Sequence, residues 1–272
     1  MQGGPKPGFL RGQVAYYVVG MDEWKYARCL EALTARYDSF YLDSTGNANS
    51  ISSPGVLSTH QGLGPPDAYT YDPRNTNGPE VAAEAVVPMG AITDQTVTTA
   101  LDQRQLIYQS MPFEADIEIS GFFKLTAWIS IDTLDTDIYA TVFEIGGGVT
   151  TKLSTDCIRA RYRESPRSPK VISSQEPLRY HFDNFTFISR LIKKGHLLRL
   201  IIAPIGRLTD STFFEKNYNG GGIVSDESVQ DAKSVTLKLF HDANYVSVLQ
   251  IPCGTPGPIP SNDKIREGTP LP

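Results

Sequence analysis

The stretch from residue 117 to residue 132, IEISGFFKLTAWISID, decides the fold class of this chain. Apolar or small residues occupy every second position of it, namely Ile117, Ile119, Gly121, Phe123, Leu125, Ala127, Ile129 and Ile131. Charged, polar and aromatic side chains lie between them. A period of two over this length is typical of a β-strand with one buried face. The stretch therefore predicts a sheet that covers a core on one side.

Other β-prone runs are separated by glycine- or proline-containing turns. They span residues 13–19, 39–42, 137–145, 149–163, 178–188, 197–203, 234–242 and 245–251. The run 197–203, LLRLIIA, is apolar on both faces except for Arg199, which indicates a central strand. One short helix is predicted within residues 22–36, where Trp24, Ala27, Leu30 and Leu33 recur at helical spacing. Many strands and few helices predict an all-β protein, an antiparallel β-sandwich with jelly-roll connections.

The composition narrows the classes of partner and compartment. The 272 residues include 25 Lys and Arg against 30 Asp and Glu, and 40% are hydrophobic, which is typical of a globular chain with an acidic balance. An acidic balance argues against nucleic acid as a partner. Neither a membrane span nor the apolar core of a signal peptide is found. Three widely spaced cysteines favour a reducing, cytoplasmic setting, and Cys157 is interpreted as a small core residue.

The motifs of common catalytic sites are missing from the sequence. A nucleophilic serine on a strand-to-helix turn needs G-x-S-x-G, and the nearest stretch, LDSTG at 42–46, lacks the first glycine. Phosphate-loop, dinucleotide and zinc-protease motifs do not occur either. We therefore expect no cofactor, no metal and no catalytic residue. One alternative stays open, in which His241 and Asp242 form a hydrogen-bonded dyad and a Ser-His-Asp triad assembles only on folding, but ordinary structural histidines are strongly favoured.

Two clusters of charged residues have both functional and structural interpretations. Arg159, Arg161 and Arg163 would share one face of a strand and form a docking stripe for carboxylates of another domain or subunit. An internal salt network is the favoured alternative. Asp132, Asp135 and Asp137 offer oxygen ligands for calcium, but a solvated hairpin turn is favoured there.

Apolar and aromatic residues suggest two further contact surfaces. Val87, Pro88 and Met89 are apolar residues in a polar loop, and leaving them exposed to water would cost free energy. They are therefore expected to cover either the pocket of a partner or their own sandwich, and the sequence favours neither. Four aromatic residues would make a sugar-stacking platform, although core packing is favoured for them: Trp24, Phe122, Trp128 and Tyr139.

Several stretches, taken in order, resemble one family. They are YTYDPRN at 69–75, LDQR at 101–104, YQS at 108–110, EISG at 118–121, residues 153–165 and NYNGG at 217–221. Residues 21–24 and 41–50 resemble the junction that follows the catalytic domain of that family. The family is the C-terminal, non-catalytic domain of the X-prolyl dipeptidyl peptidase and cocaine esterase group of serine hydrolases. The resemblance extends over about residues 13–252, and it departs at 76–80, where the usual P-x-P-T-x-G-G is absent.

The resemblance implies a galactose-binding-like jelly roll that packs on an α/β-hydrolase domain and helps to wall its substrate pocket. The catalytic triad would lie in that other domain, so this chain would be inactive alone. We expect a junction segment with a short α/β remnant at 1–50, the sandwich at 51–252 and a proline-rich mobile tail at 253–272. The expected partners are the hydrolase domain and a second copy of the chain. The alternative is a free-standing module that binds carbohydrate or another ligand.

Overall fold

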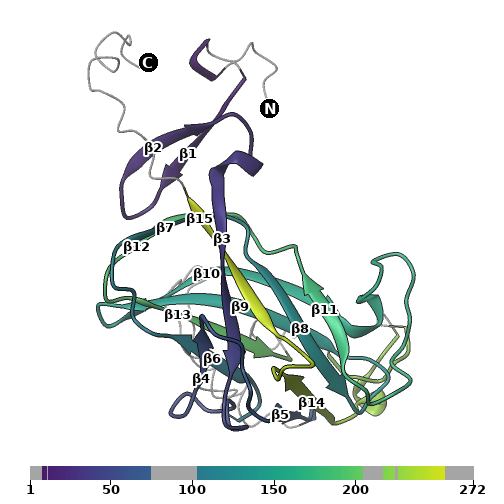
Figure 1. The fold of residues 1–272 in the computed structure, drawn as a ribbon. Helices are drawn as coiled ribbons and strands as arrows, with labels where there is room; N and C mark the ends of the chain where they lie inside the picture. The colour runs from purple at the N-terminus through teal and green to yellow at the C-terminus, as the bar shows by residue number, and fades with distance from the viewer. Residues whose placement is uncertain (1–7, 11, 75–102, 205–216, 224–225, 255–272) are drawn as a thin grey trace.

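The computed structural model describes residues 8–10, 12–74, 103–204, 217–223 and 226–254 (Figure 1). The strands are β1 (Val14–Val18), β2 (Glu23–Ala27), β3 (Thr34–Asp43), β4 (Gly55–Ser58), β5 (Asp67–Tyr71), β6 (Leu106–Ser110), β7 (Ile117–Gly121), β8 (Lys124–Ile131), β9 (Asp137–Gly146), β10 (Val149–Arg159), β11 (Leu178–Phe182), β12 (Ile188–Ile192), β13 (Leu197–Ala203), β14 (Val235–Phe240) and β15 (Val248–Gly254). The helical segments of these residues are 3₁₀ turns, η1 (Gly8–Leu10), η2 (Glu31–Leu33), η3 (Ala160–Tyr162) and η4 (Val229–Asp231). None of them is long and apolar enough to cross a bilayer.

The strands form the expected β-sandwich. One layer holds β10, β9, β13 and β6 in that order, and the other holds β3, β15, β8, β14 and β5. β11 is added to the second layer at β8, while β7 pairs with both β12 and β15. In Figure 1, β3, β15 and β8 cross over β9, β10 and β13. β4 links the layers because it pairs with β3 and with β6. The β4–β6 pair is parallel, whereas the other pairs between named strands are antiparallel, as expected for this sandwich.

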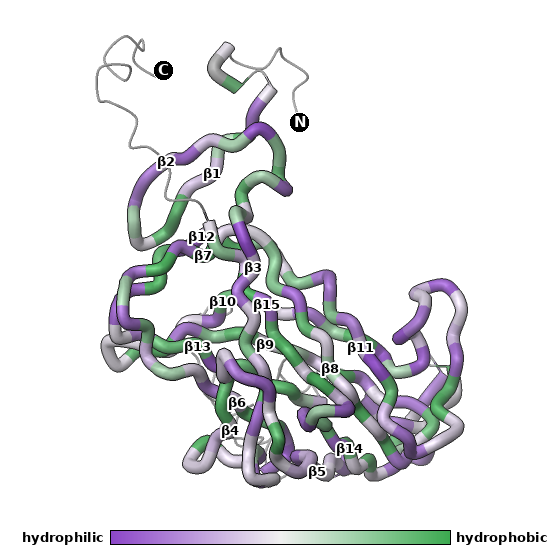
Figure 2. The backbone as a smooth tube through the Cα atoms, viewed as in Figure 1, coloured by the Kyte–Doolittle hydropathy of each residue, from purple (hydrophilic) through white to green (hydrophobic). Residues whose placement is uncertain are grey.

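The core lies between the two layers. It contains fully buried side chains from both, such as Ile129 of β8 and Leu239 of β14 on one side, and Val142 of β9 and Leu200 of β13 on the other. Figure 2 shows hydrophobic segments along strands such as β8 and β15, with many hydrophilic segments in the surrounding loops. The predicted central strand 197–203 is β13, which pairs with β9 and β6. Cys157 lies on the exposed side of β10, so its interpretation as a core residue is wrong.

The helix expected within residues 22–36 is also wrong. β2 runs through its first half and pairs with β1 along its whole length, η2 follows, and β3 begins at Thr34. Of the residues at helical spacing, only Leu33 is buried, whereas Trp24 and Leu30 are exposed. Their spacing therefore marks no buried helical face. The described part of the N-terminal segment contains strands β1, β2 and β3 and the 3₁₀ turns η1 and η2, and β3 belongs to the sandwich sheet.

The alternating stretch at 117–132 forms two strands instead of one. Its apolar set stays on the buried side from Ile119 to Ile131, as the alternation predicts. The ladder breaks at Gly121, which has a φ of 136°. A Cβ atom at this position would overlap the hydroxyl oxygen of Thr34 and press on Pro252. Gly121 therefore lets β7 pair with β12 while β8 turns to pair with β11 and β14.

Replacing Gly121 by alanine should destabilise the domain strongly. Left-handed strain and the overlap with Thr34 together should lower the free energy of unfolding by about 3 kcal/mol or more. The matched control is Gly147→Ala, because Gly147 has a φ of 59° and no neighbouring atom within 4 Å of a Cβ. That control carries only the backbone cost of about 1 kcal/mol. Equilibrium urea unfolding measures both, and equal losses would show that the close approach at Gly121 is unimportant.

Candidate functional site

Four polar side chains from distant parts of the chain meet around Asp67. Ser44 follows β3, Asp67 begins β5, Tyr108 lies in β6 and His241 follows β14. The Ser44 hydroxyl lies 2.6 Å and 2.7 Å from the two Asp67 carboxylate oxygens, to which it donates. The Tyr108 hydroxyl donates to Asp67 Oδ2 over 2.7 Å, and His241 Nε2 lies 3.0 Å from the same oxygen. Asp67, Tyr108 and His241 are fully buried.

Strand pairing places His241 beside Asp67. Leu239 of β14 pairs with Asp67 of β5, so the residue just past the end of β14 reaches the start of β5. The predicted dyad of His241 with Asp242 is wrong, because the Asp242 carboxylate accepts the backbone N–H groups of Asn244 and Tyr245 in its own turn. The sequence around His241 does not indicate Asp67 as its partner, because the two residues are 174 positions apart in the chain.

The group contains serine, histidine and aspartate, but its geometry differs from that of a catalytic triad. In a triad the imidazole lies between the other two, with one ring nitrogen on the serine and the other on the aspartate. Here the carboxylate of Asp67 lies at the centre. His241 Nε2 faces Asp67 and is 3.5 Å from Ser44 Oγ, while Nδ1 lies 3.6 Å from Asp43 and has no hydrogen-bond partner among the described residues. The Ser44 hydroxyl donates directly to Asp67, so the imidazole does not lie between them as the base of a triad does.

The same contacts make Asp67 a structural anchor. Its carboxylate also accepts the backbone N–H of Ala48, and Ser44 Oγ accepts the N–H of Gly46 over 2.8 Å. Burial alone would raise the pKa of Asp67, but hydrogen bonds from His241, Ser44 and Tyr108 outweigh it and hold the pKa below its ordinary value. Burial of the Tyr108 phenol, together with the neighbouring Asp67 carboxylate, holds the pKa of Tyr108 well above its ordinary value. Asp67 is therefore charged and Tyr108 neutral at pH 7.

Arg159 and Arg161 form a second buried network, at the start of β9 and the end of β10. Arg159 Nε lies 2.5 Å from Asp135 Oδ2, and its other nitrogens reach Asp137 at 3.3 Å and Glu227 at 3.2 Å. Arg161 Nε lies 2.6 Å from the same oxygen of Asp135, which is completely buried. Two guanidinium groups are thus neutralised by carboxylates of this chain, which favours the internal-network interpretation.

The three arginines do not share one face of a strand. β10 ends at Arg159 and η3 follows, so that part of the prediction is wrong. Arg163 Nη1 donates to the carbonyl oxygens of Ala160 and Lys170, which ties together the loop after η3. A contact of these arginines with another domain stays a prediction. Val87, Pro88 and Met89 lie outside the described residues.

The three aspartates considered for calcium have separate partners. Asp135 and Asp137 bind Arg159, and Asp132 accepts the backbone N–H of Thr236 over 2.7 Å. Across the described ranges, no group of three or more His, Cys, Asp or Glu side chains is placed to hold a metal ion. The acidic side chains of this turn hold the chain itself together, which favours the structural interpretation.

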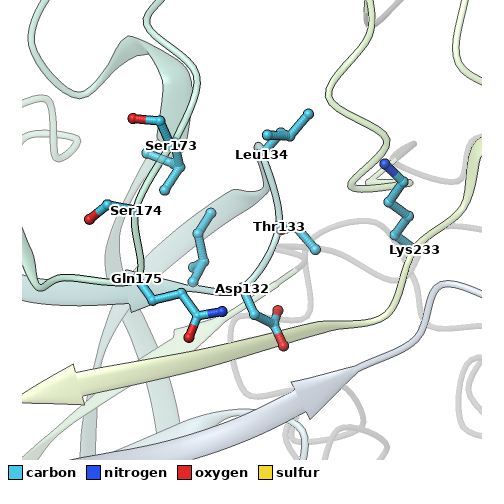
Figure 3. A pocket seen from close by; sticks show the side chains of 9 residues that line it. Asp132, Thr133, Leu134, Ser173, Ser174, Gln175 and Lys233 are labelled. Atoms are coloured by element: carbon cyan, nitrogen blue, oxygen red, sulfur yellow. The ribbon is translucent and has the colours of Figure 1, made fainter.

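A pocket of about 280 Å³ lies beside this turn. Figure 3 shows Gln175 directing its amide toward Asp132, with Lys233 approaching from the segment before β14. The described residues that line it include no aromatic side chain. The four candidate aromatics do not form one platform either, because Trp24 contacts Tyr17, Phe122 contacts Phe187 and Trp128 contacts Tyr245. Neither feature offers the continuous stacking surface that a sugar chain needs.

The charge of Asp67 should stabilise the domain at neutral pH. Because its folded pKa lies below the ordinary value of 3.8, the contribution is fully present above about pH 4 and is lost as the pH falls through the folded pKa. Asp67→Asn should lower the free energy of unfolding by about 3 kcal/mol at pH 7, and this deficit should narrow below about pH 4. Urea unfolding between pH 2.5 and 7 measures it. The control is Asp72→Asn, an exposed carboxylate paired with Arg74, which should change little at pH 7. A deficit independent of pH would refute the assignment of a charged Asp67.

The purified chain should not react with a fluorophosphonate probe at Ser44. A carboxylate whose pKa is held below its ordinary value is too weak a base to activate the Ser44 hydroxyl, and His241 does not lie between the two residues. Labelling is read by mass spectrometry, with heat-denatured protein and Ser44→Ala as controls. Labelling that needs the folded state and disappears in Ser44→Ala would overturn the structural interpretation of this cluster.

Comparisons with known proteins agree with the resemblance. The family of X-Pro dipeptidyl-peptidase C-terminal non-catalytic domains matches residues 10–204. Cocaine esterase of Rhodococcus sp. (strain MB1 Bresler) is 25% identical over 253 residues, which are 88% of this chain and 41% of that protein. The chain thus spans less than half of this relative.

Solved structures share the fold over a similar extent. An aminopeptidase from the marine sediment archaeon Thaumarchaeota archaeon superimposes with a TM-score of 0.68 at 16% identity, over 89% of this chain and 40% of its own. A CocE/NonD family hydrolase from Staphylococcus aureus superimposes with a TM-score of 0.57 at 18% identity, over 89% and 40%. Because the family match covers most of the chain, this protein belongs to the X-Pro dipeptidyl-peptidase C-terminal non-catalytic domain family.

Proposed function

We propose that this domain packs on a catalytic α/β-hydrolase domain and helps to form its substrate pocket. The observation that carries the proposal is the extent of two matches. A non-catalytic domain family matches residues 10–204 of this chain, and the part of cocaine esterase that aligns with the chain is only 41% of that enzyme. The remaining part of that relative is where a catalytic domain belongs. A covering domain excludes water from a hydrolytic site, which strengthens the electrostatic interactions inside it.

The polar clusters support a non-catalytic role for the chain itself. Ser44 and His241 hold Asp67, and Arg159 and Arg161 hold Asp135, so the buried reactive groups serve the fold. The names of the relatives refer to an esterase and an aminopeptidase. We extend that chemistry, the hydrolysis of an ester or peptide bond, to the domain on which this one packs. A free-standing carbohydrate module has less support, because the pocket lining has no aromatic side chain and Trp24, Phe122 and Trp128 lie in three separate ring pairs.

A hybrid protein tests the packing. In the hybrid, this chain replaces the matched C-terminal part of the Rhodococcus cocaine esterase. If the two parts pack on each other, differential scanning calorimetry should show one coupled unfolding transition, since neither part opens without losing the shared interface. The comparison is a second hybrid in which a long Gly/Ser linker and an unrelated β-sandwich replace this chain. Two independent transitions in the first hybrid, matching those of the separate parts, would contradict the proposal.

A further inference from the structure

The hairpin of β1 and β2 projects from one end of the sandwich (Figure 1). Its register pairs Tyr17 with Trp24 and Ala15 with Tyr26, so their side chains share one face. These three aromatic residues are exposed by 40% at Tyr17, 59% at Trp24 and 47% at Tyr26. We call them the hairpin aromatic face. Large apolar side chains gathered on one side of a projecting hairpin mark a surface that is covered by a partner.

The opposite face of the hairpin is anchored to the sandwich. Tyr16 and Val18 are buried against Leu33, and Leu191 of β12 packs on the same cluster. Lys25 forms an ion pair with the buried Glu118 of β7, and burial together with that carboxylate raises the pKa of Tyr16 to about 12. The two faces of this hairpin thus differ sharply, because one completes a small core and the other leaves about half of each aromatic side chain exposed.

Backbone contacts fix the direction in which the hairpin aromatic face points. The N–H of Val19 donates to the carbonyl of Ser189, and the N–H of Leu191 donates to the carbonyl of Val19, over 3.1 Å and 2.8 Å. Within the face, the rings of Tyr17 and Trp24 lie 5.5 Å apart, edge to face. The Tyr17 hydroxyl also donates to Asp22 over 3.0 Å. Aromatic groups already held in place lose little conformational entropy on docking, which makes them effective anchors.

We infer that the hairpin aromatic face, Tyr17, Trp24 and Tyr26, is the surface that docks on the catalytic hydrolase domain. This inference rests on the proposed function and names the contact by which it operates. In a protein where a catalytic domain comes before a C-terminal one, the connecting chain enters this domain at β1, on the hairpin itself. A tethered domain is held at high effective concentration next to the point of attachment. The occupant with the shortest path to this face is therefore the preceding domain.

The same esterase hybrid tests the contact by cysteine footprinting. Trp24→Cys is introduced into the hybrid and, separately, into the chain alone, and modification by a maleimide is read from the peptide that contains residue 24. In the hybrid, the reaction should be about tenfold or more slower than in the chain alone, because it then requires the interface to open. The matched control is Leu63→Cys. Leu63 is 79% exposed between β4 and β5, and these strands lie at the end of the sandwich away from the hairpin (Figure 1). Its rate should be the same in both proteins.

The outcomes separate this inference from the proposed function. Coupled unfolding with an unprotected residue 24, or with protection at residue 63 in its place, overturns the hairpin contact and leaves domain packing intact. Independent unfolding with an unprotected residue 24 overturns both. Protection in the chain alone that rises with its concentration identifies a second copy as the occupant, which also contradicts the inference.

A triple substitution provides a second measurement. Tyr17→Ser, Trp24→Ser and Tyr26→Ser together should split the coupled transition of the hybrid into two, because the anchors of the interface are lost. The isolated chain should keep its own unfolding temperature, since these side chains are exposed there. A single transition that survives in the hybrid would show that the docking surface lies elsewhere.

Discussion

A single buried carboxylate ties the two layers of this sandwich together. Asp67 lies at the start of β5 in one layer, and it accepts a hydrogen bond from Tyr108 in β6 of the other. It also holds the turn after β3 through Ser44 and the end of β14 through His241. A charge removed from water is tolerated only when such donors surround it. The position of each of these segments therefore depends on the others, and the end of the sandwich closes as one unit.

The stretches that resemble the serine hydrolase family have a physical explanation in this fold. Arg159 and Arg161 from 153–165 neutralise Asp135, while Asn217 and Asn219 from NYNGG accept the hydroxyl of Thr136. These motifs build a second buried polar network, which joins the turn before β9, the end of β10 and the segments at residues 217–219 and 227. These parts of the resemblance thus report how the loops of the domain are held together. That is consistent with a family whose chemistry lies in another domain.

Much of the fold could be predicted from short-range patterns, and the failures have a common cause. Alternation at 117–132 correctly predicted strands with one buried face, because successive side chains of a strand point to opposite sides of the sheet. The apolar run at 197–203 correctly predicted a strand buried on both faces. The expected helix at 22–36 failed because β2 is defined by its pairing with β1, and four apolar residues fell at helical spacing without sharing a buried face. The Asp67 cluster was missed for a stronger reason: its members are brought together by pairing of β5 with β14, which no local pattern encodes. The sequence shows that position 121 is glycine, but it does not show that the backbone there lies against Thr34 and leaves no space for a side chain.

The placement of β15 has a consequence for biosynthesis. This last described strand lies between β3 and β8 and also touches β7, so three strands have an open edge until residues 248–254 leave the ribosome. Contacts between such distant parts of a chain form slowly, and unpaired edges invite wrong pairings. Nascent chains of this domain would therefore stay incomplete, with open sheet edges, until β15 has been synthesised. Premature termination anywhere before β15 would leave the middle of the sandwich empty instead of merely shortening it.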